Sequence, residues 1–135
     1  MRLIDANVFI YAAGDEHPYK GPCLRLLDMV RQGVFQANTD IEVLQEILHF
    51  YRRRRRVDLA VEVVSNTLAL FPDPLPITVS VVARASEVLR RHPELQARDA
   101  VHVAVLITED LEGIISADRG FDAITGVTRF DPMEL

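Results

Sequence analysis

The chain opens with the stretch Arg2-Leu3-Ile4-Asp5-Ala6-Asn7, in which an apolar run ends on an acidic residue. Short apolar runs of this kind are typical of buried strands, so we predict a strand over residues 3–5 and a helix or loop after it. Asp5 and Asn7 are two residues apart, and an extended backbone points such side chains to the same side. The stretch therefore predicts a buried strand with two polar side chains at its carboxyl end.

A second stretch near the other end of the chain has the same pattern, an apolar run followed by an acidic residue. Residues 113–117, Gly-Ile-Ile-Ser-Ala, predict a buried strand, and Asp118 follows it directly. Ser116 and Asp118 are again two residues apart. In parallel α/β sheets, ligands bind outside the carboxyl ends of the strands. We therefore expect Asp5 and Asp118 to lie at one edge of a sheet.

Between these stretches, apolar periodicity predicts helices and strands in alternation. Asn38, Thr39 or Asp40 can cap a central helix, and Gly33 is a plausible end for the helix before it. The predicted helices span residues 19–31, 41–55, 59–70, 81–91 and 97–109, with a turn or short helix at 118–124, and the further strands span 34–37, 77–79 and 127–130. This alternation predicts a single α/β domain, residues 1–135, with a parallel sheet covered on both faces.

Two further acids lie in apolar surroundings within predicted helices. Glu46 interrupts an apolar stripe, and Asp99 lies in the first turn of its helix. Each of the four acids has an ordinary explanation: a cap for Asp5, a surface acid for Glu46, a favourable helix dipole for Asp99 and a turn for Asp118. Taken together they predict one pocket. Converging carboxylates stay ionised together only if cations hold them, which indicates a divalent-metal site.

Composition limits the class of protein. The 135 residues are 49% apolar with a formal net charge of −5, and the single cysteine excludes an internal disulfide. We find no secretory leader pattern, and no apolar run approaches the roughly 18–20 residues that span a bilayer. We therefore expect a cytoplasmic protein without a membrane segment.

Five of the 15 basic residues form one run, Arg52-Arg53-Arg54-Arg55-Arg56. Such a run is explained by a solvated helix end, by contact with an RNA backbone or by a partner surface. His49 and His102 lie on helices near candidate acids, and we interpret them as surface or core histidines because their spacing does not suit a zinc site.

The chain resembles the PIN-domain ribonucleases, and most closely the VapC-type toxins of toxin–antitoxin pairs. The resemblance rests on Ile4–Asn7, Glu42–His49, Ala97–Ala104 and Ser116–Asp122, in this order, and it extends over the whole chain. It implies a three-layer α/β/α sandwich with a central, mostly parallel sheet of four to five strands. Ala6 departs from the Thr or Ser of many relatives, which leaves the acids intact.

The resemblance also implies roles for particular residues. It makes Asp5, Glu46, Asp99 and Asp118 the catalytic acids, with Asp5, Asp99 and Asp118 as ligands of Mg²⁺ or Mn²⁺. It places Asn7, Ser116 and Asp122 near the metal or the phosphate. The implied activity is endoribonuclease hydrolysis that leaves a 5′ phosphate, with RNA as substrate, a cognate antitoxin as partner and a homodimer as the assembly.

Three other functions stay open at this point. A non-catalytic binding module would keep the fold and use the acidic cleft for a partner or a structural ion. A housekeeping RNA-processing nuclease would share the chemistry of a toxin. A phosphatase with Asp5 as nucleophile would need a lysine at a later strand end, and the chain's only lysine is Lys20.

Overall fold

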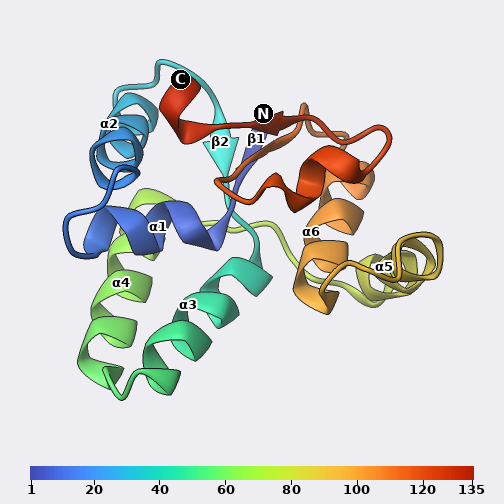
Figure 1. Ribbon diagram of the computed structural model, residues 1–135, viewed down its shortest axis with the longest axis horizontal. Coiled ribbons are helices and arrows are strands. Elements are labelled where there is room, and N and C mark those ends of the chain that lie inside the picture. Colours follow the sequence, from blue (N-terminus) through green and yellow to red (C-terminus); the bar gives the residue numbers. More distant parts are fainter.

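Four short parallel strands form the centre of the computed structural model, which describes residues 1–135 (Figure 1). In chain order they are β1 (Arg2–Ile4), β2 (Ala37–Asn38), β3 (Ile114–Ile115) and β4 (Arg129–Phe130). Their spatial order is β2-β1-β3-β4, with every neighbouring pair parallel. The predicted mostly parallel sheet of four to five strands is confirmed, and β1 and β3 are its two central strands.

Six helices cover the sheet. They are α1 (Ala6–Ala13), α2 (Lys20–Arg31), α3 (Ile41–Arg53), α4 (Val57–Leu70), α5 (Val79–Arg91) and α6 (Ala97–Thr108), and two short 3₁₀ helices follow, η1 (Arg119–Ala123) and η2 (Pro132–Glu134). Helices α1 to α4 lie on one side of the sheet and α5 and α6 on the other (Figure 1). No helix is both long and apolar enough to span a membrane.

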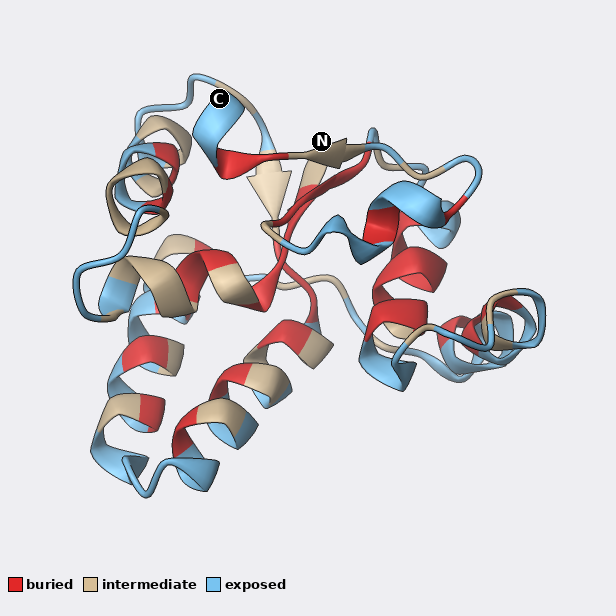
Figure 2. Ribbon diagram, viewed as in Figure 1, coloured by how far each residue is buried: buried red, intermediate tan, exposed pale blue.

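The two layers of helices bury two separate clusters of apolar side chains. Ile4 and Ile115 point into the cluster formed with α1 to α4, whereas Leu3 and Ile114 point into the cluster formed with α5 and α6. Successive residues of a strand face opposite sides of a sheet, which explains this division. Figure 2 shows the buried residues on the helix faces that look toward the sheet and the exposed residues outside. The predicted three-layer sandwich is therefore confirmed.

Side-chain caps fix where several helices begin. Asp40 accepts a hydrogen bond from the backbone N–H of Val43 at the start of α3, and Thr78 does the same for Val81 at the start of α5. Capping oxygens satisfy backbone donors that have no partner within the helix. Among the three cap candidates for the central helix, the structure selects Asp40.

The predicted strand over residues 77–79 is wrong. Thr78 caps α5 and Val79 is already helical, because the Thr78 hydroxyl satisfies a helix donor that a strand would direct to a neighbour. The extended pairing lies slightly earlier, where Leu75 forms an isolated parallel bridge with Asp40. The strand predicted at 34–37 also shifts, and only Ala37 and Asn38 pair with β1.

Candidate active site

A cleft of about 370 Å³ opens at the carboxyl end of the sheet. All four acids line it, although they come from four separate segments of the chain: Asp5 follows β1, Glu46 lies on α3, Asp99 on α6 and Asp118 after β3. The structure thus brings together the acids that the sequence selected.

Asp5 is held by three hydrogen bonds at the junction of β1 and α1. Its Oδ1 accepts from the backbone N–H of Ala6 at 2.7 Å, and its Oδ2 accepts from the Ser116 hydroxyl at 2.6 Å and from the Asn7 amide at 3.2 Å. The residue is only 5% exposed. Burial raises the pKa of the Asp5 carboxyl, and nearby His102 opposes this shift.

Asn7 and Ser116 tie the ends of the two central strands together. The Asn7 amide nitrogen donates to Ser116 Oγ at 3.0 Å, and its oxygen accepts from the backbone N–H of Ala117 at 3.2 Å. Ser116 Oγ also accepts from the backbone N–H of Asp118 at 3.0 Å. Because β1 and β3 pair in register at Ile4 and Ile115, the residues after each strand meet.

Asp99 and Asp118 complete the acidic side of the cleft. Asp99 lies in the first turn of α6 and is 8% exposed, whereas Asp118 is exposed and caps η1 through a 2.8 Å bond from the Gly120 N–H. Burial, with repulsion from Asp5 and Asp118, raises the pKa of Asp99 to about 6.

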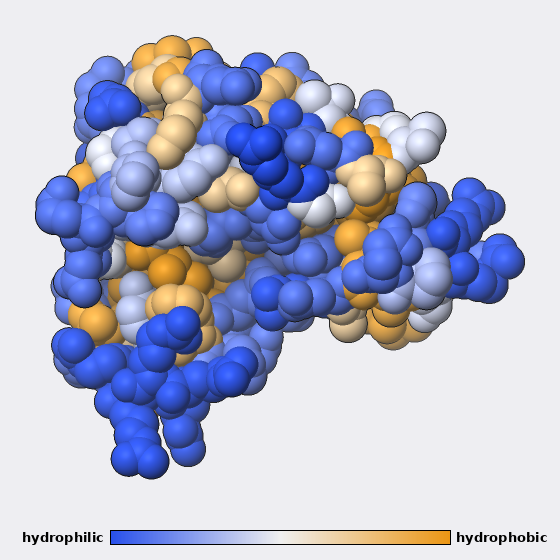
Figure 3. All heavy atoms as spheres, in the orientation of Figure 1, coloured by the Kyte–Doolittle hydropathy of each residue, from blue (hydrophilic) through white to orange (hydrophobic).

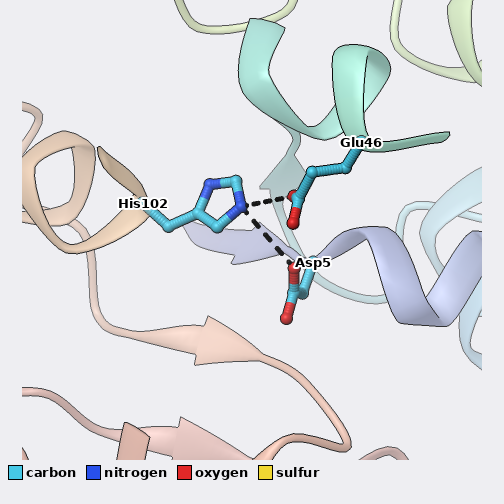
Figure 4. A group of neighbouring side chains, drawn as sticks. All are labelled: Asp5, Glu46 and His102. Carbon is cyan, nitrogen blue, oxygen red and sulfur yellow. Dashed lines mark hydrogen bonds and ion pairs between the residues drawn. The ribbon is translucent and has the colours of Figure 1, made fainter. Parts of the chain in front are cut away.

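Glu46 is held between two basic side chains. Arg98 Nε lies 2.8 Å from Glu46 Oε1 at the surface. Inside, His102 Nε2 lies 2.7 Å from Glu46 Oε2 (Figure 4). His102 is fully buried, and its Nδ1 lies 2.7 Å from Oδ2 of the fully buried Asp40. Burial alone lowers the pKa of His102, but the charge of Asp40 and the bonds to Asp40 and Glu46 raise it well above its usual value.

The roles of His102 and Asp40 in this cluster are not evident from the sequence, which indicates only a core or surface histidine at position 102. His102 is a core histidine, yet it contacts a candidate catalytic acid. One signal could have found it: Asp99 and His102 are three residues apart on one helix, so they share a face. For its partner Asp40, the sequence indicates only a possible helix cap and gives no sign of the contact with His102.

The arginine run is divided by the end of α3. Arg53 and Arg54 line the cleft, and the Arg54 guanidinium lies over the Phe50 ring at 3.5 Å. Arg56 instead pairs with Asp58 on α4. Figure 3 shows a strongly hydrophilic projection where α3 and α4 meet. The cleft therefore has an acidic floor and a basic rim.

Asp122 does not join the other acids. Its carboxylate accepts from Arg129 Nε at 2.9 Å and from Arg129 Nη2 at 3.2 Å, outside the cleft. This pairing lowers the pKa of Asp122. Asp122 lies on η1, and its partner Arg129 lies on β4.

The donor set fits a divalent cation. Carboxylate oxygens suit hard ions such as Mg²⁺ and Mn²⁺. Oxygens of Asp5 and Glu46 lie within 4.8 Å of one another and line the same cleft as Asp99 and Asp118. Burial is the main cause of the raised pKa values of Asp5 and Asp99, and repulsion from neighbouring carboxylates adds to it; a bound cation would oppose both shifts.

Comparison with known sequences identifies relatives along the whole chain. The PIN domain family model matches residues 2–127. Ribonuclease VapC13 of Mycobacterium tuberculosis is 38% identical over 132 residues, which cover 96% of this chain and 98% of that protein. Ribonuclease VapC7 of the same species is 31% identical over 136 residues, with coverages of 98% and 92%.

Solved structures share the fold. VapC20 of Mycobacterium tuberculosis, reported as a toxin that cleaves the sarcin–ricin loop, has a TM-score of 0.77 at 20% identity and covers 95% of this chain and 97% of its own. FitAcB of Neisseria gonorrhoeae has a TM-score of 0.76 at 19% identity with full coverage of both chains, 100% and 100%. From the family model and the two relatives at 38% and 31% identity, this chain belongs to the PIN domain family and, within it, to the VapC ribonucleases.

Proposed function

We propose that this protein is a metal-dependent endoribonuclease that acts as the toxin of a toxin–antitoxin pair. One observation carries the proposal: four carboxylates from separate segments line a single cleft whose rim is basic. The ribonuclease names of relatives at 38% and 31% identity support the same activity. The alternatives are a binding module of this fold and a housekeeping nuclease.

In this proposal Asp5, Asp99 and Asp118 hold Mg²⁺ or Mn²⁺, and Glu46 completes the catalytic set. A divalent cation bound there neutralises the scissile phosphate and makes an attacking water more acidic. Ser116 and Asn7 fix the orientation of the Asp5 carboxylate through their hydrogen bonds.

The basic rim supplies the attraction for RNA. Arg53, Arg54 and Arg98 border the acids, so an incoming phosphodiester meets positive charge before it reaches the carboxylates. Lysine and arginine contacts with phosphates dominate nucleic-acid affinity and make it dependent on salt. A local patch can do this despite the net charge of −5, because charges are screened beyond roughly 8–10 Å.

A cognate antitoxin is the proposed protein partner. The related fold of VapBC2 from Rickettsia felis was solved as a complex bound to promoter DNA, at a TM-score of 0.70 and 14% identity. An antitoxin arginine placed among the cleft carboxylates would form charge-assisted hydrogen bonds there. We also propose a homodimer, which the exposed Val57 and Val61 of α4 support and which light scattering would test.

The test is cleavage of a structured RNA pool by the purified protein, freed of any partner, with Mn²⁺ or Mg²⁺ and with EDTA. Discrete cuts with 5′ phosphate ends are expected, and they should disappear with EDTA and in Asp99→Asn. Asp73→Asn, which changes an exposed acid outside the cleft by the same chemistry, is the matched control. A folded protein that binds Mn²⁺ but cuts nothing would favour the binding module.

A further inference from the structure

The imidazole of His102 connects two acids of the same helix. Asp40 caps the start of α3 and Glu46 lies in its second turn, and each carboxylate lies 2.7 Å from one ring nitrogen of His102. Ionised carboxylates only accept hydrogen bonds, so both ring nitrogens donate. The ring comes from α6, so it also fixes the separation of α3 and α6.

Asp40 is a rigid anchor for this ring. It is fully buried, and its other oxygen accepts from the Val43 N–H at 2.9 Å. Both carboxylate oxygens are thereby committed, one to the helix cap and one to His102 Nδ1. The ring orientation is set from behind, and Nε2 points to Glu46 and toward Asp5 Oδ1, which lies 3.7 Å away (Figure 4).

Without this ring the Glu46 carboxylate would have one fixed contact left. That contact is Arg98, whose side chain is 46% exposed and long enough to move. Glu46 is 12% exposed, so it needs a defined partner inside the protein. Carboxylates behind a metal-binding shell commonly orient its ligands in the same way.

We infer that His102, held by Asp40, is a positioning residue that sets the Glu46 carboxylate against Asp5 in the catalytic cleft. The inference rests on the proposed function, since it concerns the geometry of the same acids. Helix α6 then contributes twice: Asp99 lines the cleft itself, and His102, one turn later, holds the acid contributed by α3. Glu46 lines the cleft, and His102 affects the reaction only through the position of the Glu46 carboxylate.

Two substitutions of His102 distinguish a role in positioning Glu46 from a role in supporting the fold. In His102→Asn the amide reaches about as far as Nδ1, so the hydrogen bond to Asp40 is kept and the one to Glu46 is removed. In His102→Gln the amide reaches about as far as Nε2, so the hydrogen bond to Glu46 is kept and the buried Asp40 is left without its partner. His92→Asn, at the C-terminal end of α5 and outside the cleft, is the matched control.

The expected result is that activity and stability rank in opposite orders. His102→Asn should be the more stable variant in urea unfolding, yet its kcat on the RNA that the wild type cuts should fall by about 10- to 100-fold, with KM little changed and Mn²⁺ bound more weakly. His102→Gln should be the less stable variant but keep more of kcat. An activity order that follows stability would overturn the inference, as would tighter Mn²⁺ binding by His102→Asn with unchanged kcat.

A measurement on the unmodified protein covers the case in which neither variant folds. In nitrogen NMR of protein labelled at histidine, Mg²⁺ should shift the Nε2 signal of His102 more than the Nδ1 signal. An unchanged His102 ring in protein that binds Mg²⁺ would overturn the positioning role. If the wild type binds Mg²⁺ and shows this shift but cuts no RNA, the proposed nuclease fails while the positioning of Glu46 stands.

Discussion

The Ser116 hydroxyl donates a 2.6 Å hydrogen bond to Asp5 Oδ2 across the two central strands. Ser116 is fully buried and Asp5 is 5% exposed, so the bond lies in a region that water does not reach freely. The hydrogen bond opposes the rise in pKa that burial causes at Asp5. Ser116 therefore helps keep Asp5 both ionised and oriented.

Replacing Ser116 by alanine should weaken catalysis and lower stability together. A buried carboxylate that loses a hydrogen bond costs about 1–3 kcal/mol of unfolding free energy. The pKa of Asp5 should rise further, and cleavage at neutral pH should need more Mn²⁺ for the same rate. Urea unfolding and a Mn²⁺ titration of the cleavage rate measure the two effects.

Ser86→Ala is the control for this substitution. The Ser86 hydroxyl also makes a hydrogen bond, to the Val82 carbonyl, but it is exposed on α5 and remote from the cleft. Its removal should leave both the Mn²⁺ dependence and the cleavage rate unchanged. Equal effects of the two serine substitutions would show that Ser116 has no special part in the site.

Protein without metal should lose stability as the pH rises through the pKa of Asp99. That pKa is raised from 3.8 to about 6, so the folded state favours the protonated acid. The contribution of Asp99 to stability is then complete below about 4 and lost as the pH passes about 6. In EDTA, the stability of Asp99→Asn relative to wild type should therefore increase as the pH rises from about 4 to about 6. Urea unfolding at several pH values measures this difference.

Asp58→Asn supplies a control of opposite sign. The hydrogen bond from Arg56 lowers the pKa of Asp58, so its ionised form favours the folded state. This variant should lose stability relative to wild type as the pH rises toward 3.8, and should show little further change between about 4 and 6. If Asp58→Asn also gains stability between about 4 and 6, the raised pKa of Asp99 is not the cause.

Asp122→Asn should leave the reaction almost unaffected. The Asp122 side chain is 54% exposed and pairs with Arg129 outside the cleft. Arg129 would keep its bonds to the Ser116 carbonyl and to Asp131, so we expect little change in kcat. Asp118→Asn, four residues earlier and within the cleft, should abolish turnover. Steady-state cleavage by the two variants decides the point, and a large drop in kcat for Asp122→Asn would assign that acid a part in catalysis.

Arg53→Ala combined with Arg54→Ala should weaken RNA binding in a salt-dependent way. Both side chains line the cleft. For each arginine–phosphate interaction that is removed, the slope of log affinity against log salt should fall by about one. Fluorescence anisotropy with a single-stranded RNA, in an Asp99→Asn background that cannot cut, measures this slope.

Arg52→Ala combined with Arg55→Ala removes the same charge from the same run. Neither of these residues lines the cleft, so the slope should stay near that of the parent protein. Equal effects of the two double substitutions on this slope would indicate that the whole arginine run attracts RNA by its charge. Arg53 and Arg54 would then make no specific contact in the cleft.

The sequence predicted the sheet correctly wherever a run of apolar residues was unambiguous. Residues 3–4 and 114–115 are fully buried, and burial on both faces of a strand demands an unbroken apolar run. The stretch at 77–79 looked similar but begins a helix, because the Thr78 cap and the packing of α5 outweigh local strand preference.

By itself, the amino-acid sequence selected the four acids and predicted their places, two at strand ends, one in the first turn of a helix and one within an apolar helix stripe, since these follow from local patterns of apolar and charged residues. Only the tertiary structure decided how His102 and Asp122 are used. His102 meets Asp40, which is 62 residues away in the chain, and Asp122 is drawn to Arg129. Such contacts depend on how helices cross a sheet, and no periodicity along the chain encodes the partner of a polar side chain.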